Sequence, residues 1–392
     1  MNAIATLILL MLALPATASS LYLLLFTLLS RAPPASLRSS RRLTFDVIVP
    51  AHDEAAAIES VVASLRRLDW PADGFRVLVI ADNCTDVTAA LARAAGAEVL
   101  ERHDTTRRGK GHALDFAFQA SQARGWAEAV VVVDADTEVS ANLLEAFAAR
   151  IESGAKAIQA HYGVLNSRDS WRTRLMTIAM ASFHRVRSRA RERLQLSCGI
   201  RGNGWCITHR LLRQVPYRAF SLAEDIEYGI DLGLAGYRVH YADEAQVAAM
   251  MVPGEPAARS QRRRWEDGRL RLIRSRTLPL LQAAKGSGGW VCLDLALDLL
   301  VLPLSYVAIN VAALIVLAGV ALLWEPSMES WLWLGLGCGM SLLLYVLRGW
   351  QLSGVGMRGL VDLARAPFFV LWKVLLMLRA HDSAEWVRTK RE

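Results

Sequence analysis

Two long apolar segments, one near each end of the chain, set the first limit on how it folds. Residues 3–30 carry no charge and are long enough to cross a hydrocarbon layer of about 30 Å. A cleaved signal peptide is the alternative, because LPATAS supplies small residues near Ala18. However, no Lys or Arg precedes the apolar run, and it continues well past that point. We therefore expect residues 1–30 to form an N-terminal transmembrane helix.

The second apolar region, residues 290–350, exceeds one span and is interrupted by the turn EPSMES, which has no Lys or Arg. Asp294 and Asp298 fall in its first part, so we expect an interfacial or bent start, with the crossing near 302–324. About two spans result. Charges and a proline interrupt the apolar residues after 355, which favours an amphipathic helix in the membrane plane over another span, with a cytosolic tail ending at residue 392.

The charges indicate which side of the membrane the middle of the chain faces. Arg31, Arg38, Arg41 and Arg42 follow the first apolar segment, so the positive-inside rule places the N-terminus outside and the middle of the chain in the cytosol. This predicts an integral protein of a bacterial inner or plasma membrane.

Composition narrows the partners. A hydrophobic fraction of 53% is too high for an ordinary soluble enzyme, and the net charge of +8 fits membrane lipids or a phosphate-bearing ligand. No zinc-finger, RNP-like or basic heptad pattern is present, so we expect no nucleic acid partner. The five cysteines form no CxxC pair and are interpreted as reduced thiols.

The middle of the chain alternates strands and helices. Apolar runs at 45–51, 76–82 and 129–133 are typical of buried strands, AEVLER at 97–102 is interpreted as a further strand, and helical spacing separates them. This predicts an α/β domain with a mainly parallel sheet over residues 43–275. No GxGxxG or GxxxxGK[ST] motif occurs, so a dinucleotide-binding domain or a P-loop is not indicated.

Acidic residues follow three of these strands, and the carboxyl ends of parallel strands share one edge of a sheet. The three groups are His52-Asp53-Glu54, Asp82-Asn83 and Asp134-Ala135-Asp136. We therefore expect them to form one site, including Glu54 as a substrate-binding residue. Asp134 and Asp136 offer hard oxygen ligands for a divalent cation that would bridge a diphosphate, although a DxD sequence alone also occurs by chance in surface loops.

Further motifs lie outside these strand ends. Lys110 follows Gly109 at a helix start and is suited to phosphate, although a plain loop fits the pattern equally well. Gly202, Asn203 and Gly204 allow close approach of the backbone to an acceptor.

Taken in order, FDVIVPAHDE, VLVIADNCTD, VVVDAD, GNG, AEDIEYG and QRRRW resemble the inverting family 2 glycosyltransferases. The similarity is strongest to the membrane-embedded branch that contains cellulose, hyaluronan, chitin and poly-N-acetylglucosamine synthases. It covers about residues 44–275, and it implies a GT-A-type domain that binds a UDP-sugar with Mg²⁺ or Mn²⁺.

The resemblance also assigns roles to individual residues. Asp53 and Asp82 would hold the uridine, and Asp134 and Asp136 the ribose, the diphosphate and the metal. Asp225 would be the general base, with Glu224 beside it. Gln261, Arg264 and Trp265 would line the diphosphate and the acceptor end.

The chain departs from the family pattern at two positions. Ala81 replaces the first of two adjacent aspartates, and Ala223 stands where the motif before the base often has Thr. The second change removes a hydroxyl near the acceptor, so this motif does not define the acceptor class.

The residues support this chemistry independently. Displacement at an anomeric carbon needs a base aligned with the acceptor hydroxyl, and Glu224-Asp225 supplies two carboxylates at a helix start. A simple helix cap is the alternative for that pair. Arg264 and Gln261 share a helical face and suit the leaving diphosphate, while Arg262 and Arg263 point elsewhere, toward lipid headgroups.

Three functions follow. The first is processive synthesis of a polysaccharide or oligosaccharide on a glycan acceptor, with homo-oligomers or export subunits as further partners. The second is a glycolipid synthase, similar to ceramide glucosyltransferases, that adds one sugar to a lipid acceptor. The third is a membrane receptor that binds a nucleotide without turnover.

Overall fold

The computed structural model describes residues 2–34, 38–251, 255–286 and 289–365, and in helix α10 it describes the side chains from Asp267 on. The described residues divide into two compact units. The helical unit contains residues up to 31, then 167–190, and those from 297. The sheet unit contains 32–166 and 191–296.

The sheet unit is built on eight strands in the order β3-β2-β1-β4-β7-β6-β8-β5. Neighbouring strands pair in parallel among β1, β2, β3 and β4, and between β6 and β8; the other pairs are antiparallel. The strands are β1 (Phe45–Ala51), β2 (Phe75–Asp82), β3 (Glu98–Arg102), β4 (Ala129–Val132), β5 (Thr137–Val139), β6 (Ala157–Val164), β7 (Trp205–Thr208) and β8 (His240–Ala249). The expected α/β class and the parallel first four strands are confirmed.

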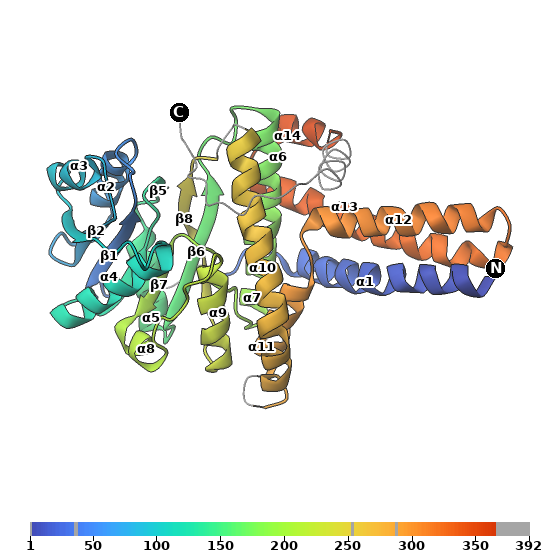
Figure 1. Cartoon of the computed structure of the whole chain (residues 1–392), viewed down its shortest axis with the longest axis horizontal. Helices are drawn as coiled ribbons and strands as arrows, with labels where there is room; N and C mark the ends of the chain where they lie inside the picture. The colour runs from blue at the N-terminus through green and yellow to red at the C-terminus, as the bar shows by residue number, and fades with distance from the viewer. Residues whose placement is uncertain (1, 35–37, 252–254, 287–288, 366–392) are drawn as a thin grey trace. The chain divides into compact units, whose positions relative to one another are not determined.

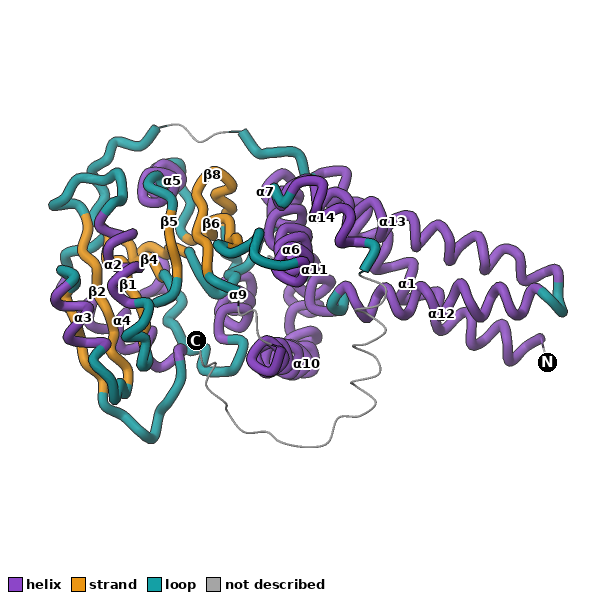
Figure 2. The backbone as a smooth tube through the Cα atoms, turned by 90° about the horizontal axis from the view of Figure 1, so that it is seen from above, coloured by secondary structure: helices purple, strands orange, loops and turns teal. Residues whose placement is uncertain are grey.

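Alternation along the strands produces two cores, one on each face of the sheet. In β1, Val47 and Val49 pack on one face and Ile48 on the other. The first face is covered by α2 (Ile58–Arg66), α3 (Thr88–Ala94) and α5 (Leu143–Glu152), and the second by α4 (Lys110–Arg124), α8 (His209–Gln214) and α9 (Glu224–Leu234). Figure 1 and Figure 2 show this layering around the strands. The layers fix the carboxyl ends of β1, β2 and β4 along one edge.

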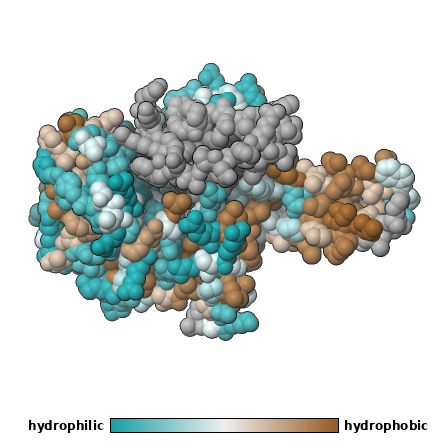
Figure 3. All heavy atoms as spheres, in the orientation of Figure 1, coloured by the Kyte–Doolittle hydropathy of each residue, from teal (hydrophilic) through white to brown (hydrophobic). Residues whose placement is uncertain are grey.

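Within the described residues, the helical unit contains three helices that are long and apolar enough to cross a membrane. They are α1 (Asn2–Leu29), α12 (Leu304–Leu322) and α13 (Glu329–Ser353), the last preceded by the short 3₁₀ turn η2 (Pro326–Met328). They lie side by side in Figure 1 and Figure 2 around a shared apolar core. Hydrophobic residues also cover the outside of this bundle, drawn brown in Figure 3, with Leu7 57% and Val316 61% exposed. The helices are thus apolar both toward their shared core and toward the outside, as a lipid environment requires.

Polar contacts secure the ends of this bundle. Arg348 of α13 donates to Ser30 just after α1, with Nε 2.8 Å from Oγ and Nη2 3.1 Å from the carbonyl oxygen. Next to these helices the chain forms α6 (Trp171–Met180), a π-helical turn η1 (Ala181–Val186) and α7 (Arg187–Arg193).

The aspartates of the second apolar region are explained by ion pairs. Within the helical unit, Arg187 Nη1 lies 3.0 Å from Asp298 Oδ1, and within the sheet unit Arg191 Nε lies 2.7 Å from Asp294 Oδ2. Both aspartates belong to α11 (Gly289–Leu300), a separate helix that precedes α12; its expected interfacial position stays a prediction. Buried charges of this kind are tolerated only when paired.

The remaining helices are α10 (Glu255–Ala283), in the sheet unit, and α14 (Gly356–Leu363), in the helical unit. Helix α14 covers the start of the expected in-plane helix after 355, and Asp362 within it is paired with Arg174 and Arg365. Residues 366–392, which hold the rest of that prediction and the expected cytosolic tail, lie outside the described residues.

Candidate active site

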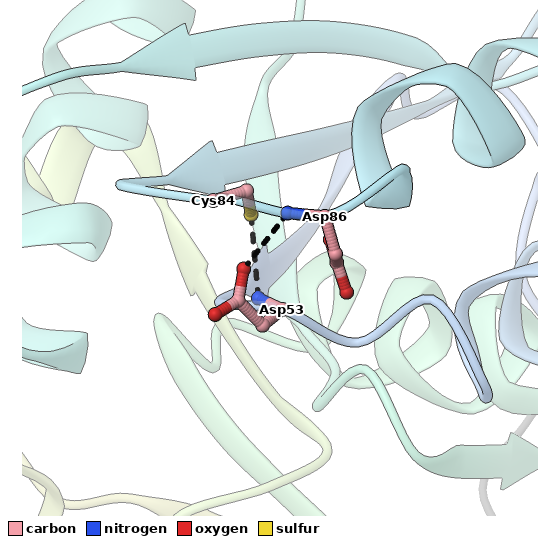
Figure 4. A group of neighbouring side chains, drawn as sticks. All are labelled: Asp53, Cys84 and Asp86. Atoms are coloured by element: carbon pink, nitrogen blue, oxygen red, sulfur yellow. Dashed lines mark hydrogen bonds between the residues drawn. The ribbon is translucent and has the colours of Figure 1, made fainter.

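Asp53 lies just beyond β1 in a left-handed backbone conformation, with φ +53°. Its Oδ1 accepts hydrogen bonds from the backbone N–H groups of Thr85 at 2.6 Å and Asp86 at 3.3 Å. Figure 4 shows this carboxylate beside Cys84 and Asp86 on the turn after β2. Burial raises the pKa of Asp53, but these hydrogen bonds outweigh it and the pKa is lowered. The carboxylate is therefore held ionised between two strand ends.

Asp82, the last residue of β2, is buried and paired with a cation. Its Oδ1 lies 2.6 Å from Arg102 Nη1 and accepts a hydrogen bond from Asn83 Nδ2 at 3.0 Å. Arg102 also lies 3.1 Å from Asp104 Oδ2. The expected nucleotide carboxylate is thus already part of an ion-pair network, which fixes its direction.

Lys110 is the central cation of a second group of side chains. It is the first residue of α4, and its Nζ lies 2.5 Å from Asp134 Oδ1 and 3.9 Å from Glu224 Oε1. It also donates to the Gly202 carbonyl oxygen at 2.6 Å. Burial lowers the pKa of Lys110, but Asp134, Glu224 and Asp225 outweigh it, so the pKa is raised and the ammonium persists. Residues from four parts of the sequence therefore come together around the Lys110 ammonium group.

The GNG motif provides the framework of this group. The buried Asn203 accepts from the Asp134 backbone N–H at 3.0 Å through Oδ1 and donates to Thr137 Oγ1 at 2.7 Å. Gly202 has φ +84°, and a Cβ there would lie 3.3 Å from Asp225 Oδ2. A side chain at this position would combine backbone strain with crowding of that carboxylate. The motif thus brings Asp225 and Asp134 to the same backbone segment.

Glu224 and Asp225 begin helix α9, as expected. Burial raises the pKa of Glu224 to about 7; Lys110 opposes the shift and Asp225 adds to it. Burial also raises the pKa of Asp225, against the Ile226 backbone N–H, Lys110 and Arg201. Since the Glu224 side chain is only 14% exposed, its carboxyl group is poised near neutral pH, and the raised pKa of Asp225 makes that carboxylate a better proton acceptor.

The metal prediction rests on Asp134 and Asp136, which flank the turn between β4 and β5. Among the described residues, a different group brings three ligand atoms within 4.8 Å of one another: Asp53, Cys84 and Asp86. Burial raises the pKa of the Cys84 thiol, which donates to the Ala51 carbonyl oxygen at 3.5 Å. A protonated, soft sulfur ligand does not suit Mg²⁺ or Mn²⁺, whereas the two carboxylates after β4 provide the hard oxygen donors that these ions prefer.

Other predicted residues are located as follows. Glu54 opens the turn into α2, where its carbonyl oxygen accepts from the Ala57 and Ile58 N–H groups at 3.0 Å. Gln261, Arg264 and Trp265 belong to helix α10, but their side chains lie outside those described, so their roles stay predictions.

The sequence analysis did not single out Arg102, Thr85 or Arg201. Arg102 contacts Asp82, Thr85 contacts Asp53, and Arg201 opposes the rise in the pKa of Asp225. Arg102 is the last residue of β3. The rule that ligands bind at the carboxyl ends of strands would have found it, had basic residues been considered together with acidic ones. Nothing in the local sequence marks Thr85 or Arg201.

Comparisons with known proteins identify the family of the chain. The family model described as glycosyl transferase family group 2 matches residues 129–378, more than half of the chain. Glycosyltransferase AglD of Haloferax volcanii is 37% identical over 114 residues, which cover 28% of this chain and 18% of that protein. The probable glycosyltransferase YdaM of Bacillus subtilis is 24% identical over 239 residues, covering 57% of this chain and 54% of that protein. The chain therefore spans about half, or less, of the length of these curated relatives.

Among solved structures, mannosyltransferase PcManGT from Pyrobaculum calidifontis, in complex with GDP-Man and Mn²⁺, superposes with a TM-score of 0.51. The sequences are 19% identical, and the alignment covers 87% of this chain and 98% of that chain. At this identity the likeness is one of fold, and it agrees with the expected GT-A-type architecture.

Proposed function

The chain belongs to glycosyl transferase family group 2, and we propose that it moves a sugar from a nucleoside-diphosphate sugar to an acceptor hydroxyl with inversion at the anomeric carbon. The observation that carries this proposal is the buried pair Glu224-Asp225 beside Lys110 and Asp134. Carboxylates with raised pKa values next to a fixed cation suit proton removal on one side and a leaving anion on the other.

In this mechanism Asp225 takes the proton of the acceptor hydroxyl. The acceptor oxygen then bonds to the anomeric carbon from the side opposite the diphosphate, and the carbon–oxygen bond to the diphosphate breaks. Lys110 and Arg264 offset the negative charge that develops on the leaving group. Asp53 and Asp82 hold the nucleoside. Asp134 and Asp136 would hold Mg²⁺ or Mn²⁺, which supplies charge neutralisation at the diphosphate.

The nucleotide base of the donor is the first open point. The resemblance to the polysaccharide synthases implies UDP, whereas the Pyrobaculum mannosyltransferase is in complex with GDP-Man. We propose UDP as the donor nucleotide, since the PAHDE motif and Asp82 follow the synthase pattern, although Ala81 departs from it.

The acceptor is the second open point. The QRRRW sequence ahead of the C-terminal apolar segments favours a growing glycan, extended at the cytosolic face of a bacterial inner or plasma membrane. One observation favours a lipid acceptor instead. Phe220 and Leu222, on the segment that leads into Glu224, are 46% and 48% exposed, and apolar side chains suit an acyl chain better than a sugar.

The test uses the full chain in lipid nanodiscs with Mn²⁺ or Mg²⁺ and a panel of UDP- and GDP-sugars, with nucleotide release and product size as readouts. A ladder or high polymer supports glycan synthesis. A single sugar added only when a lipid acceptor is supplied supports the glycolipid function. No release with any donor, in protein that still binds nucleotide, contradicts the enzymatic proposal and favours a nucleotide receptor.

A further inference from the structure

Helices α9 and α10 are joined by one arginine and two carboxylates. Arg276 of α10 places Nη2 3.3 Å from Glu227 Oε1 and Nη1 3.1 Å from Asp231 Oδ1. The two carboxylates lie four residues apart, on one face of α9. Their side chains have similar exposure, 16% for Glu227 and 23% for Asp231. If only the ion pair with Arg276 is considered, Glu227 and Asp231 are nearly equivalent.

Glu227 differs from Asp231 in a second contact. Its Oε2 accepts a hydrogen bond from the Ser221 backbone N–H at 3.2 Å, while Ser221 Oγ accepts from the Ala223 N–H at 3.3 Å. A carboxylate in the first turn of α9 therefore reaches back and fixes the segment that immediately precedes Glu224. One side chain connects this segment to α10.

Two close backbone approaches hold the same segment, residues 219–223, from both sides. A Cβ at Gly268 of α10 would lie 2.9 Å from Ala223 Cβ, so the helix touches the segment where any larger residue would displace it. On the other side, a Cβ at Gly111 of α4 would overlap the Ala219 carbonyl oxygen. The segment is clamped between the helix that carries Lys110 and the helix that carries the QRRRW residues.

We propose that Glu227 is a positioning residue. By binding both the Ser221 N–H and Arg276, it fixes the position of segment 219–223 relative to helix α10, and thereby the positions of Glu224 and Asp225. This inference rests on the proposed glycosyl transfer. A displacement of about 1 Å at reacting groups costs on the order of 10²-fold in rate, so loss of the link lowers kcat. We expect donor KM to stay unchanged, because the nucleoside carboxylates, Asp53 and Asp82, lie at the ends of β1 and β2.

The test compares Glu227→Ala with Asp231→Ala, each of which removes one carboxylate partner of Arg276. We expect kcat to fall roughly 10- to 100-fold in Glu227→Ala and less than about threefold in Asp231→Ala, with donor KM unchanged in both. Glu227→Gln retains an acceptor for the Ser221 N–H and is expected to recover most of the loss. Equal kcat values in the two alanine variants would mean that Glu227 acts only through its ion pair with Arg276 between α9 and α10. That result would overturn the inference.

A readout without turnover separates this inference from the proposed function. Amide hydrogen exchange in segment 219–223 is expected to rise in Glu227→Ala and to stay at the wild-type level in Asp231→Ala. If the wild-type protein has no transferase activity, the proposed function fails, yet the exchange comparison still decides whether Glu227 orders the segment.

Gly268→Ala provides a second, independent perturbation in case Glu227→Ala does not fold. It is expected to lower kcat by displacing Ala223. Gly286→Ala is the matched control, because a Cβ there would meet its nearest neighbour, the Ala283 carbonyl oxygen, at an ordinary 3.7 Å. Full activity of Gly268→Ala would contradict the required close approach.

Discussion

Replacing Glu224 by Gln tests the electrostatics of the site through stability rather than turnover. Glu224 is buried beside Asp225, and Lys110 at 3.9 Å offsets only part of the resulting cost of ionisation. Its pKa is therefore raised from 4.5 to about 7. The folded protein then holds this proton over a pH range in which the unfolded chain has lost it. Stability from this group is fully present below pH 4.5 and is lost as pH rises through about 7.

The magnitude follows from the shift. A change from 4.5 to about 7 corresponds to an upper bound of about 3 kcal/mol of unfavourable ionisation in the folded state above neutral pH. Glutamine has nearly the same shape and no charge to bury. Glu224→Gln should therefore raise stability by no more than about 1 kcal/mol at pH 5 and by up to about 3 kcal/mol at pH 8. For a unit of this size, that corresponds to roughly 6–12 °C in Tm.

The assay is thermal unfolding of the full chain in nanodiscs at pH 5 and pH 8, without nucleotide or metal. Glu59→Gln, at an exposed position on α2, is the matched control and should change Tm little at either pH. A Tm difference for Glu224→Gln that is the same at both pH values, or that falls as pH rises, would refute the electrostatic reasoning.

Three further predictions follow from the site. Gly202→Ala should reduce kcat at least tenfold in steady-state kinetics, because the added Cβ crowds Asp225. Gly125→Ala is the control: this glycine has φ +62°, and no atom lies within 4 Å of its Cβ position. Thermal unfolding should show the backbone cost of about 1–3 kcal/mol in both variants, but Gly125→Ala should keep full kcat. Arg102→Gln should weaken nucleotide affinity at least tenfold in calorimetry by releasing Asp82, and unchanged affinity would exclude that role. Chelation by EDTA should abolish transfer, and Mn²⁺ or Mg²⁺ should restore it; persistent activity would contradict the metal prediction.

The sequence predicted the parallel half of the sheet because β1, β2 and β4 are short, largely apolar runs, a pattern typical of buried strands. Strand β3 is more exposed, and it was predicted from its place after the expected helix that ends at Gly96. Strands β5, β6, β7 and β8 were not predicted. Gln159 and His161 are buried in β6, so its pattern resembles neither a fully apolar nor an alternating strand. Strand β7 has only four residues, and its antiparallel pairing with β4 joins segments more than seventy positions apart. Such pairing is decided by tertiary packing rather than by local pattern.

The site shows the same division. Asp134, Lys110 and Glu224 were each selected from the sequence, but as separate contacts to a ligand, and the structure instead brings them together around one ammonium group. Glu227 and Arg276 carry no signal, because charged residues on helix surfaces are common and their partners depend on which helix packs against which.

The central claim is that Asp225 removes the acceptor proton in a sugar transfer, and Asp225→Asn tests it most directly. The full chain in nanodiscs, with its preferred nucleotide sugar and Mn²⁺, should lose 10²- to 10⁴-fold in kcat, while nucleotide affinity stays within about threefold of wild type. Transfer that persists at the wild-type rate in Asp225→Asn, with nucleotide bound as before, would contradict the account.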